Sequence, residues 1–84
     1  MDKIEPLRQE INKVDEQIIA LLEKRLDTTG KIWDVKKKMY IPLRDKKKEN
    51  ERIELLKKNT KLNPKIIEIL YQMIYEENER IHGQ

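Results

Sequence analysis

The sequence predicts an all-α protein whose 84 residues form one domain, residues 1–84. Signals for β-strands are absent, because polar and apolar residues do not alternate and the chain has only two glycines and no Asn-Gly or Asp-Gly turn. Apolar residues instead recur at spacings of three and four, the period of an amphipathic helix. Charged residues make up 42% of the chain, which is typical of long, exposed helices that associate with one another.

A first helix is predicted from about Pro6 to Lys38. Pro6 suits a first helical turn, and Pro42 prevents the helix from continuing. Gly30 lies inside this segment, but no other turn-forming residues accompany it. The apolar seam of this helix consists of Ile4, Leu7, Ile11, Val14, Ile18, Leu21, Ile32, Val35 and Met39.

Two shorter helices are predicted to follow. One begins after Asp45, a good N-cap, and ends near Asn59. The other begins at Pro64, with Asn63 as its N-cap. The apolar face of this last helix consists of Ile66, Ile67, Leu70, Met73, Ile74 and Ile81.

The length of the first helix predicts an oligomer. At 1.5 Å per residue it would extend on the order of 50 Å, more than the diameter of a globule of this size. The two short, polar helices cannot cover it. An intertwined homodimer, in which two long helices pack together and the short ones close over them, would bury the seam. The alternative is a helical monomer with an unpaired, frayed end.

The composition argues against several classes of protein. Without cysteine there is no disulfide framework or thiolate chemistry, and a single histidine argues against a histidine-based metal site. The longest apolar run, IIALL, is far shorter than the ~20 residues that span a bilayer, and the N-terminus lacks the apolar core of a signal peptide. We therefore expect a cytoplasmic protein with no metal and no membrane partner. A net charge of +3 suits a small acidic ligand.

Polar residues interrupt the apolar positions at two places. Arg25 occupies a seam position, where a guanidinium needs an anionic partner, and Lys36 follows eleven residues later near the same face. Arg25 could turn to the surface, pair with a carboxylate of another helix, or bind a ligand carboxylate. On the last helix, a stripe at helical spacing, either core-edge packing or a set of ligand contacts, comprises Tyr71, Tyr75, Asn78 and His82.

These segments, in this order, resemble the all-helical chorismate mutases. The resemblance rests on LRQEINKVDEQIIALLEKR, on KIWDVKKKMYIPLRD and on ILYQMIYEENERIH, with a lysine eleven residues after the arginine that ends the first of these segments. It covers nearly the whole chain. It implies a dimer of three-helix protomers and the Claisen rearrangement of chorismate to prephenate, in the route to phenylalanine and tyrosine, without a cofactor or a covalent intermediate.

The resemblance also implies roles for individual residues. Arg25 and, from the other protomer, Arg8 would hold the two carboxylates of the substrate. Lys36 would donate to the ether oxygen, which gains negative charge as its bond to carbon breaks. Glu49 would accept a hydrogen bond from the ring hydroxyl, and Asp45 would line the same region.

Three positions depart from the family pattern. Lys48 stands where an arginine is typical and keeps the charge without the bidentate fork. His82 stands where a glutamine or glutamate completes the pair of donors to the ether oxygen, and a neutral imidazole donates from only one nitrogen. Asn78 replaces a small hydroxyl or amide residue in the substrate-binding set.

Other functions stay open at this point. A related enzyme on the same scaffold eliminates pyruvate from isochorismate, and an aminated chorismate is a further candidate substrate. The lysines at 36–38 and 46–48 could form a phosphate-binding edge, although interspersed acidic residues argue against a nucleic-acid partner. An inactive homologue that regulates a larger enzyme of the shikimate pathway, or a mutase that such an enzyme activates, is another hypothesis.

Overall fold

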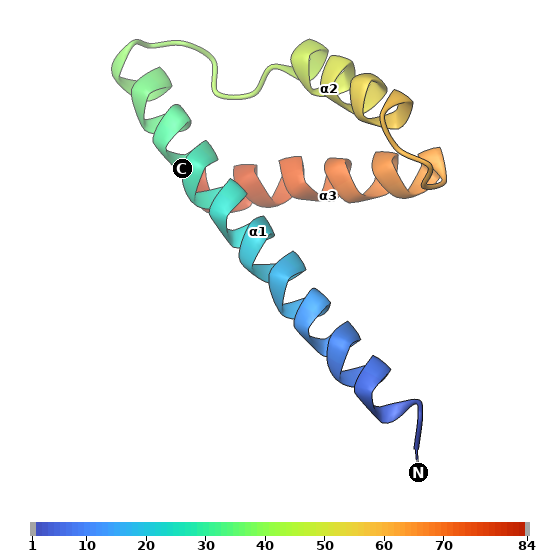
Figure 1. Ribbon diagram of the computed structural model, residues 1–84. Helices are drawn as coiled ribbons and strands as arrows, with labels where there is room; N and C mark the ends of the chain where they lie inside the picture. Colours follow the sequence, from blue (N-terminus) through green and yellow to red (C-terminus); the bar gives the residue numbers. More distant parts are fainter. Residues whose placement is uncertain (1, 84) are drawn as a thin grey trace.

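The computed structural model describes residues 2–83, which form three α-helices (Figure 1). They are α1 (Glu5–Lys38), α2 (Lys46–Lys58) and α3 (Pro64–His82). The predicted all-α class is confirmed, and so is the long first helix. The predicted limits of the first two helices and the start of the third agree with the structure to within one residue. None of these helices is long and apolar enough to cross a membrane.

Side-chain caps set the starts of the two short helices, as the sequence predicts. The Asp45 carboxylate accepts a hydrogen bond from the Lys48 backbone N–H at 3.1 Å, and the Asn63 side chain accepts one from the Lys65 N–H at 2.9 Å. Each bond satisfies a backbone donor that the first helical turn leaves without a partner. These caps fix the residues at which α2 and α3 begin.

The chain is elongated, with principal extents of 61 × 24 × 17 Å. The helix α3 crosses the C-terminal half of α1 and also packs against α2, while the segment 39–45 arches from α1 to α2 (Figure 1). The N-terminal half of α1 projects away from the other two helices. The three-helix packing is therefore confined to one end of α1.

The core within a single chain is small. Its buried members are Ile53 of α2 with Ile67 and Tyr75 of α3, and Leu56 and Tyr71 pack against them. The inward face of α3 carries the polar and aromatic stripe, since Tyr75 and Asn78 are buried. Of the apolar face predicted for α3, only Ile67 is buried, whereas the side chains that stay at least 39% exposed are Ile66, Leu70, Met73 and Ile81.

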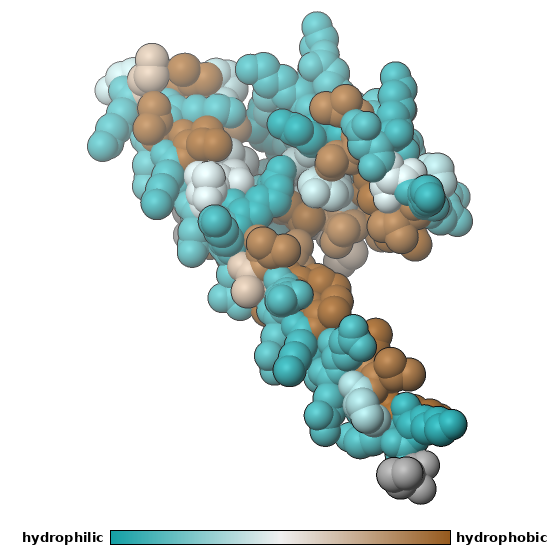
Figure 2. Space-filling model, in the orientation of Figure 1, coloured by the Kyte–Doolittle hydropathy of each residue, from teal (hydrophilic) through white to brown (hydrophobic). Residues whose placement is uncertain are grey.

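The apolar seam of α1 is uncovered in the single chain. Brown apolar side chains run along one side of its projecting half in Figure 2. All nine seam residues are at least 43% exposed: Ile4, Leu7, Ile11, Val14, Ile18, Leu21, Ile32, Val35 and Met39. An exposed apolar stripe of this length, interrupted only around Arg25, is a typical association surface.

The end of α3 docks against α1 at Gly30. The Nε2 atom of His82 lies 3.0 Å from the backbone carbonyl oxygen of Leu26, and its ring lies edge-on to Trp33 with 6.5 Å between centroids. A carbonyl oxygen can only accept, so this contact requires a proton on Nε2. A Cβ atom on Gly30 would lie 2.6 Å from the His82 ring. The absence of a side chain at residue 30 thus makes room for His82.

Candidate active site

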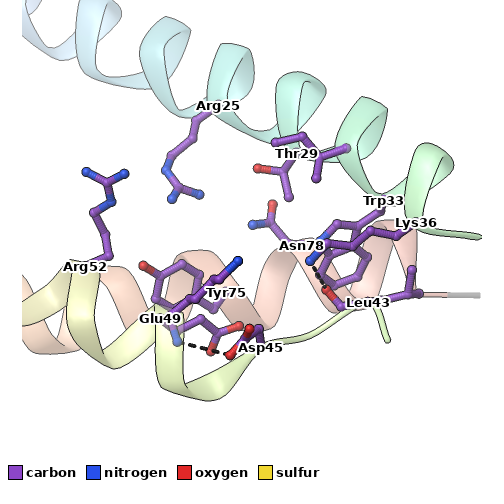
Figure 3. A pocket seen from close by; sticks show the side chains of 12 residues that line it. Arg25, Thr29, Trp33, Lys36, Leu43, Asp45, Glu49, Arg52, Tyr75 and Asn78 are labelled. Atoms are coloured by element: carbon purple, nitrogen blue, oxygen red, sulfur yellow. Dashed lines mark hydrogen bonds between the residues drawn. The ribbon is translucent and has the colours of Figure 1, made fainter. Parts of the chain in front are cut away.

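A pocket of about 270 Å³ lies between the three helices (Figure 3). From α1, side chains spaced three or four residues apart line one wall, as expected for one face of a helix. The cap and first two turns of α2 supply the opposite wall, and α3 supplies the floor. The lining residues are Arg25, Thr29, Ile32, Trp33, Lys36, Leu43, Asp45, Lys48, Glu49, Arg52, Tyr75 and Asn78.

Arg25 is half-buried and lies over two aromatic rings. Its guanidinium carbon is 5.5 Å from the ring centroid of Tyr71 and 5.5 Å from that of Tyr75. Such cation–π contacts hold a guanidinium without using its N–H donors. Within residues 2–83, Arg25 forms no ion pair with a carboxylate. Its donors therefore stay available to an anion in the pocket.

Lys36 is oriented by the segment that follows α1. Its Nζ atom donates to the backbone carbonyl oxygen of Leu43 at 3.0 Å (Figure 3). The ammonium group has three donors, so this bond fixes its position and leaves two N–H groups for a ligand. The segment itself is held to α1 by a bond from the Ile41 N–H to the Lys36 carbonyl oxygen at 2.9 Å.

Glu49 is held by an arginine that does not line the pocket. The Nε atom of Arg44 lies 3.1 Å from each carboxylate oxygen of Glu49, and Nη1 of the same guanidinium donates to Glu79 at 2.7 Å. The side chain of Glu49 is only 15% exposed, so this pairing is partly shielded from solvent. Arg44 thereby ties the start of α2 to the end of α3 and partly neutralises an acidic residue of the pocket.

Two groups of α3 complete the floor. Asn78 is 2% exposed, and its Oδ1 atom is buried without a hydrogen-bond partner among residues 2–83. Burial raises the pKa of the Tyr75 hydroxyl, so this phenol stays protonated at neutral pH. A buried amide oxygen without a partner normally costs free energy, so Asn78 is a candidate ligand contact.

The chain matches the family described as chorismate mutase type II over residues 7–83. It belongs to that family. Two relatives are named bifunctional chorismate mutase/prephenate dehydratase. The one from Aquifex aeolicus (strain VF5) is 27% identical over 82 residues, 98% of this chain and 21% of the relative. The one from Buchnera aphidicola subsp. Schizaphis graminum (strain Sg) is 38% identical over 74 residues, 84% of this chain and 19% of the relative.

The chain thus spans about a fifth of the length of these curated relatives. No solved structure matches it significantly. The family assignment agrees with the resemblance seen in the sequence, and it makes the pocket between the helices the candidate active site of a chorismate mutase type II domain.

Six of the eight site residues predicted from the sequence line this pocket. They are Arg25, Lys36, Asp45, Lys48, Glu49 and Asn78. They come from all three helices, so the fold brings together residues up to 53 positions apart in the sequence. The roles assigned to them stay predictions.

The other two predicted site residues lie elsewhere. Arg8 lines a separate depression with Leu7 and Ile11 on the projecting half of α1. It lies 17 residues, or roughly 25 Å of helix, from Arg25. His82 is not among the residues that line the pocket and directs Nε2 at Leu26. Its role as a donor to the substrate also stays a prediction.

Sequence reasoning missed two arginines at this candidate site. Arg52 lines the pocket, and Arg44 holds Glu49 from outside. The Tyr75 ring, which belongs to the stripe noted in the sequence, forms part of the floor. The sequence spacing could have identified Arg52, because it follows Lys48 by four residues and therefore lies on the same face of α2. Arg44 stands within the IPLRD segment, directly before the cap residue of α2.

Proposed function

We propose that this chain catalyses the rearrangement of chorismate to prephenate in the pocket between α1, α2 and α3. The observation that supports this most directly is the charge of the lining. Four basic side chains and two acidic ones face the pocket, and one of the two acids is already paired with Arg44. A substrate with two carboxylates matches that excess of positive charge.

Arg25 and Lys48 bind one end of the substrate in this proposal. The planar guanidinium of Arg25, held over two tyrosine rings, can form two parallel hydrogen bonds to a carboxylate. Lys48 adds a single positive charge from the opposite wall. Arg8 binds the second carboxylate, and it must come from another chain, because it lies roughly 25 Å along α1 from its own pocket.

The active form is accordingly a homodimer. The apolar seam of α1 and the outer face of α3 are both exposed in the single chain. A second copy that packs its own α1 along this surface would bury the nine seam residues and bring its Arg8 to the pocket. Activation by another enzyme of the pathway stays a prediction for which the chain offers no further support.

The chemistry needs no nucleophile and no proton transfer, because the rearrangement is unimolecular. Lys36, fixed by the Leu43 carbonyl, donates to the ether oxygen as its bond to carbon breaks. Glu49, fixed by Arg44, accepts from the ring hydroxyl, and Asp45 lines the same end of the pocket. The pocket selects the compact chair-like conformer in which the two reacting carbons lie close together.

The two α3 residues Asn78 and His82 have different roles in this proposal. Asn78 presents a buried amide to the pocket and can add a hydrogen bond to the substrate. His82 can act as a donor only through Nδ1 or after its contact with Leu26 breaks. We therefore assign the main donor role to Lys36 and keep His82 as a prediction.

The test is a direct assay of the purified chain with chorismate, following chorismate loss and prephenate formation together. We expect conversion well above the uncatalysed rate, and loss of most of it in Arg25→Ala. Conversion no faster than in buffer would contradict the proposal. Release of pyruvate from isochorismate would identify the lyase instead, and salt-sensitive binding to DNA would support the nucleic-acid hypothesis.

A further inference from the structure

Arg52 is a second arginine in the pocket, and it has no role in the proposed mechanism so far. It lies one helical turn after Lys48 and three residues after Glu49, on the same face of α2. Figure 3 shows its guanidinium reaching from α2 into the space that Arg25 enters from α1. Two guanidinium groups thus enter one pocket from opposite walls.

No acidic side chain within residues 2–83 pairs with Arg52. Two other arginines are paired, since Arg44 bonds to Glu49 and Glu79, and Arg80 bonds to Glu77. Glu49 precedes Arg52 by three residues, a spacing that permits an ion pair on a helix, yet both of its carboxylate oxygens face Arg44. The charge of Arg52 is therefore not neutralised by the protein.

Tyr75 places a hydroxyl group beside these two guanidinium groups. Its ring lies beneath Arg25, and Figure 3 shows its hydroxyl end on the side of the pocket where Arg52 lies. The positive charges of Arg25 and Arg52 both lower the pKa of this phenol, but burial outweighs them and keeps it protonated. A protonated phenol can donate a hydrogen bond to an anion.

We propose that Arg52, together with Arg25 and the Tyr75 hydroxyl, forms a carboxylate-binding subsite at this end of the pocket. Like charges that share a pocket repel each other, and an anion between them removes that repulsion. The guanidinium of Arg52 is planar and can form two parallel hydrogen bonds to a carboxylate. The ammonium group of Lys48, on the same helix, cannot do this. This inference rests on the proposed function, because it takes a carboxylate of chorismate as the ligand.

The experiment compares Arg52→Gln with Lys58→Gln. Both changes remove one positive charge from an exposed residue of α2, but only Arg52 lines the pocket. Steady-state kinetics with chorismate, and calorimetric titration with chorismate and with prephenate, are measured for each variant. Arg52→Lys serves as the conservative variant, and circular dichroism checks that each variant keeps its helices.

A charged hydrogen bond lost equally from the bound substrate and the transition state raises KM and leaves kcat nearly unchanged. We expect KM and the prephenate dissociation constant to rise about 10- to 100-fold in Arg52→Gln, with a smaller rise in Arg52→Lys and a change under about twofold in Lys58→Gln. Equal values for the two glutamine variants would overturn the subsite, as would a fall in kcat at constant KM.

The outcomes also separate this inference from the proposed function. An active wild-type chain whose Arg52→Gln variant binds normally would overturn only the subsite. A wild-type chain that binds chorismate without converting it would contradict the mutase proposal, and the titrations would still decide the role of Arg52. A wild-type chain that neither binds nor converts chorismate would overturn both.

Discussion

Arg44 faces Glu49 with its Nε atom 3.1 Å from each carboxylate oxygen, while Nη1 of the same guanidinium reaches Glu79 on α3 at 2.7 Å. A residue outside the pocket thus sets the position of an acidic residue inside it. Because the pair is partly shielded from solvent, it holds Glu49 more firmly than an exposed surface pair would.

Removing this support should weaken catalysis. In Arg44→Gln we expect kcat/KM for chorismate to fall roughly tenfold, because Glu49 loses a charge-assisted hydrogen bond and its fixed orientation. Arg80→Gln is the matched control, since Arg80 pairs with Glu77 at a 70% exposed position and should change kcat/KM little. Equal effects of the two changes in steady-state kinetics would argue against this role of Arg44.

Lys36 is expected to carry the largest single effect on the chemical step. A fixed donor directed at a developing negative charge typically contributes 100- to 1000-fold in kcat, so Lys36→Gln should lower kcat by about that factor. Lys38→Gln removes the same charge from an exposed position in the last turn of α1 and should stay near the wild-type rate. Single-turnover measurements with chorismate compare the two, and a similar kcat for both would contradict the assignment.

The proposed dimer predicts a sharp difference between two adjacent residues of α1. Ile18→Glu places a carboxylate on the seam, where its burial without a partner costs several kcal/mol and occurs twice in a symmetric dimer. Gln17→Glu adds the same charge at the neighbouring position, off the seam. Analytical ultracentrifugation should detect a monomer only for Ile18→Glu, and its activity should fall as well. A monomeric wild-type chain would contradict the dimer.

The contact between Gly30 and His82 predicts strongly coupled effects on stability. Alanine stabilises a helix interior by up to about 1 kcal/mol relative to glycine, but at residue 30 its Cβ would collide with the imidazole. We expect Gly30→Ala to be neutral or destabilising in the wild type and stabilising by about 0.5–1 kcal/mol in a His82→Ala background.

Urea unfolding of the four chains at one protein concentration measures this coupling. Additive effects would show that His82 does not occupy the space above Gly30. A large fall in kcat for His82→Ala without coupling would instead support the donor role that the resemblance implies.

The limits of the helices could be predicted because local chemistry sets them. Asp45 and Asn63 cap helices whichever surfaces those helices later cover. The buried face of α3 could not be predicted in the same way. Its apolar side chains form the most regular stripe, yet within one chain Tyr75 and Asn78 are buried on its inward face. Periodicity identifies an apolar face without saying which other helix or chain will cover it.

The site shows the same division between local pattern and packing. The spacing of Arg25 and Lys36 on one helix face could be read directly from the sequence. The roles of Arg44 and Arg52 could not be assigned from the sequence, because a chain in which 42% of residues are charged places many basic side chains near acidic ones. Their roles depend on which acidic partner each one reaches, and this follows only from the packing of α2 against α3.

The distance along α1 between Arg8 and Arg25 has a genetic consequence. If every catalytic centre takes one of these arginines from each polypeptide, two inactive mutants can complement each other. Co-refolding an Arg8→Ala chain with an Arg25→Ala chain would create hybrids in which one centre carries both lesions and the other is intact. Random pairing makes half of the dimers hybrids, and each hybrid has one intact centre of two. About a quarter of full turnover would then return from two inactive variants.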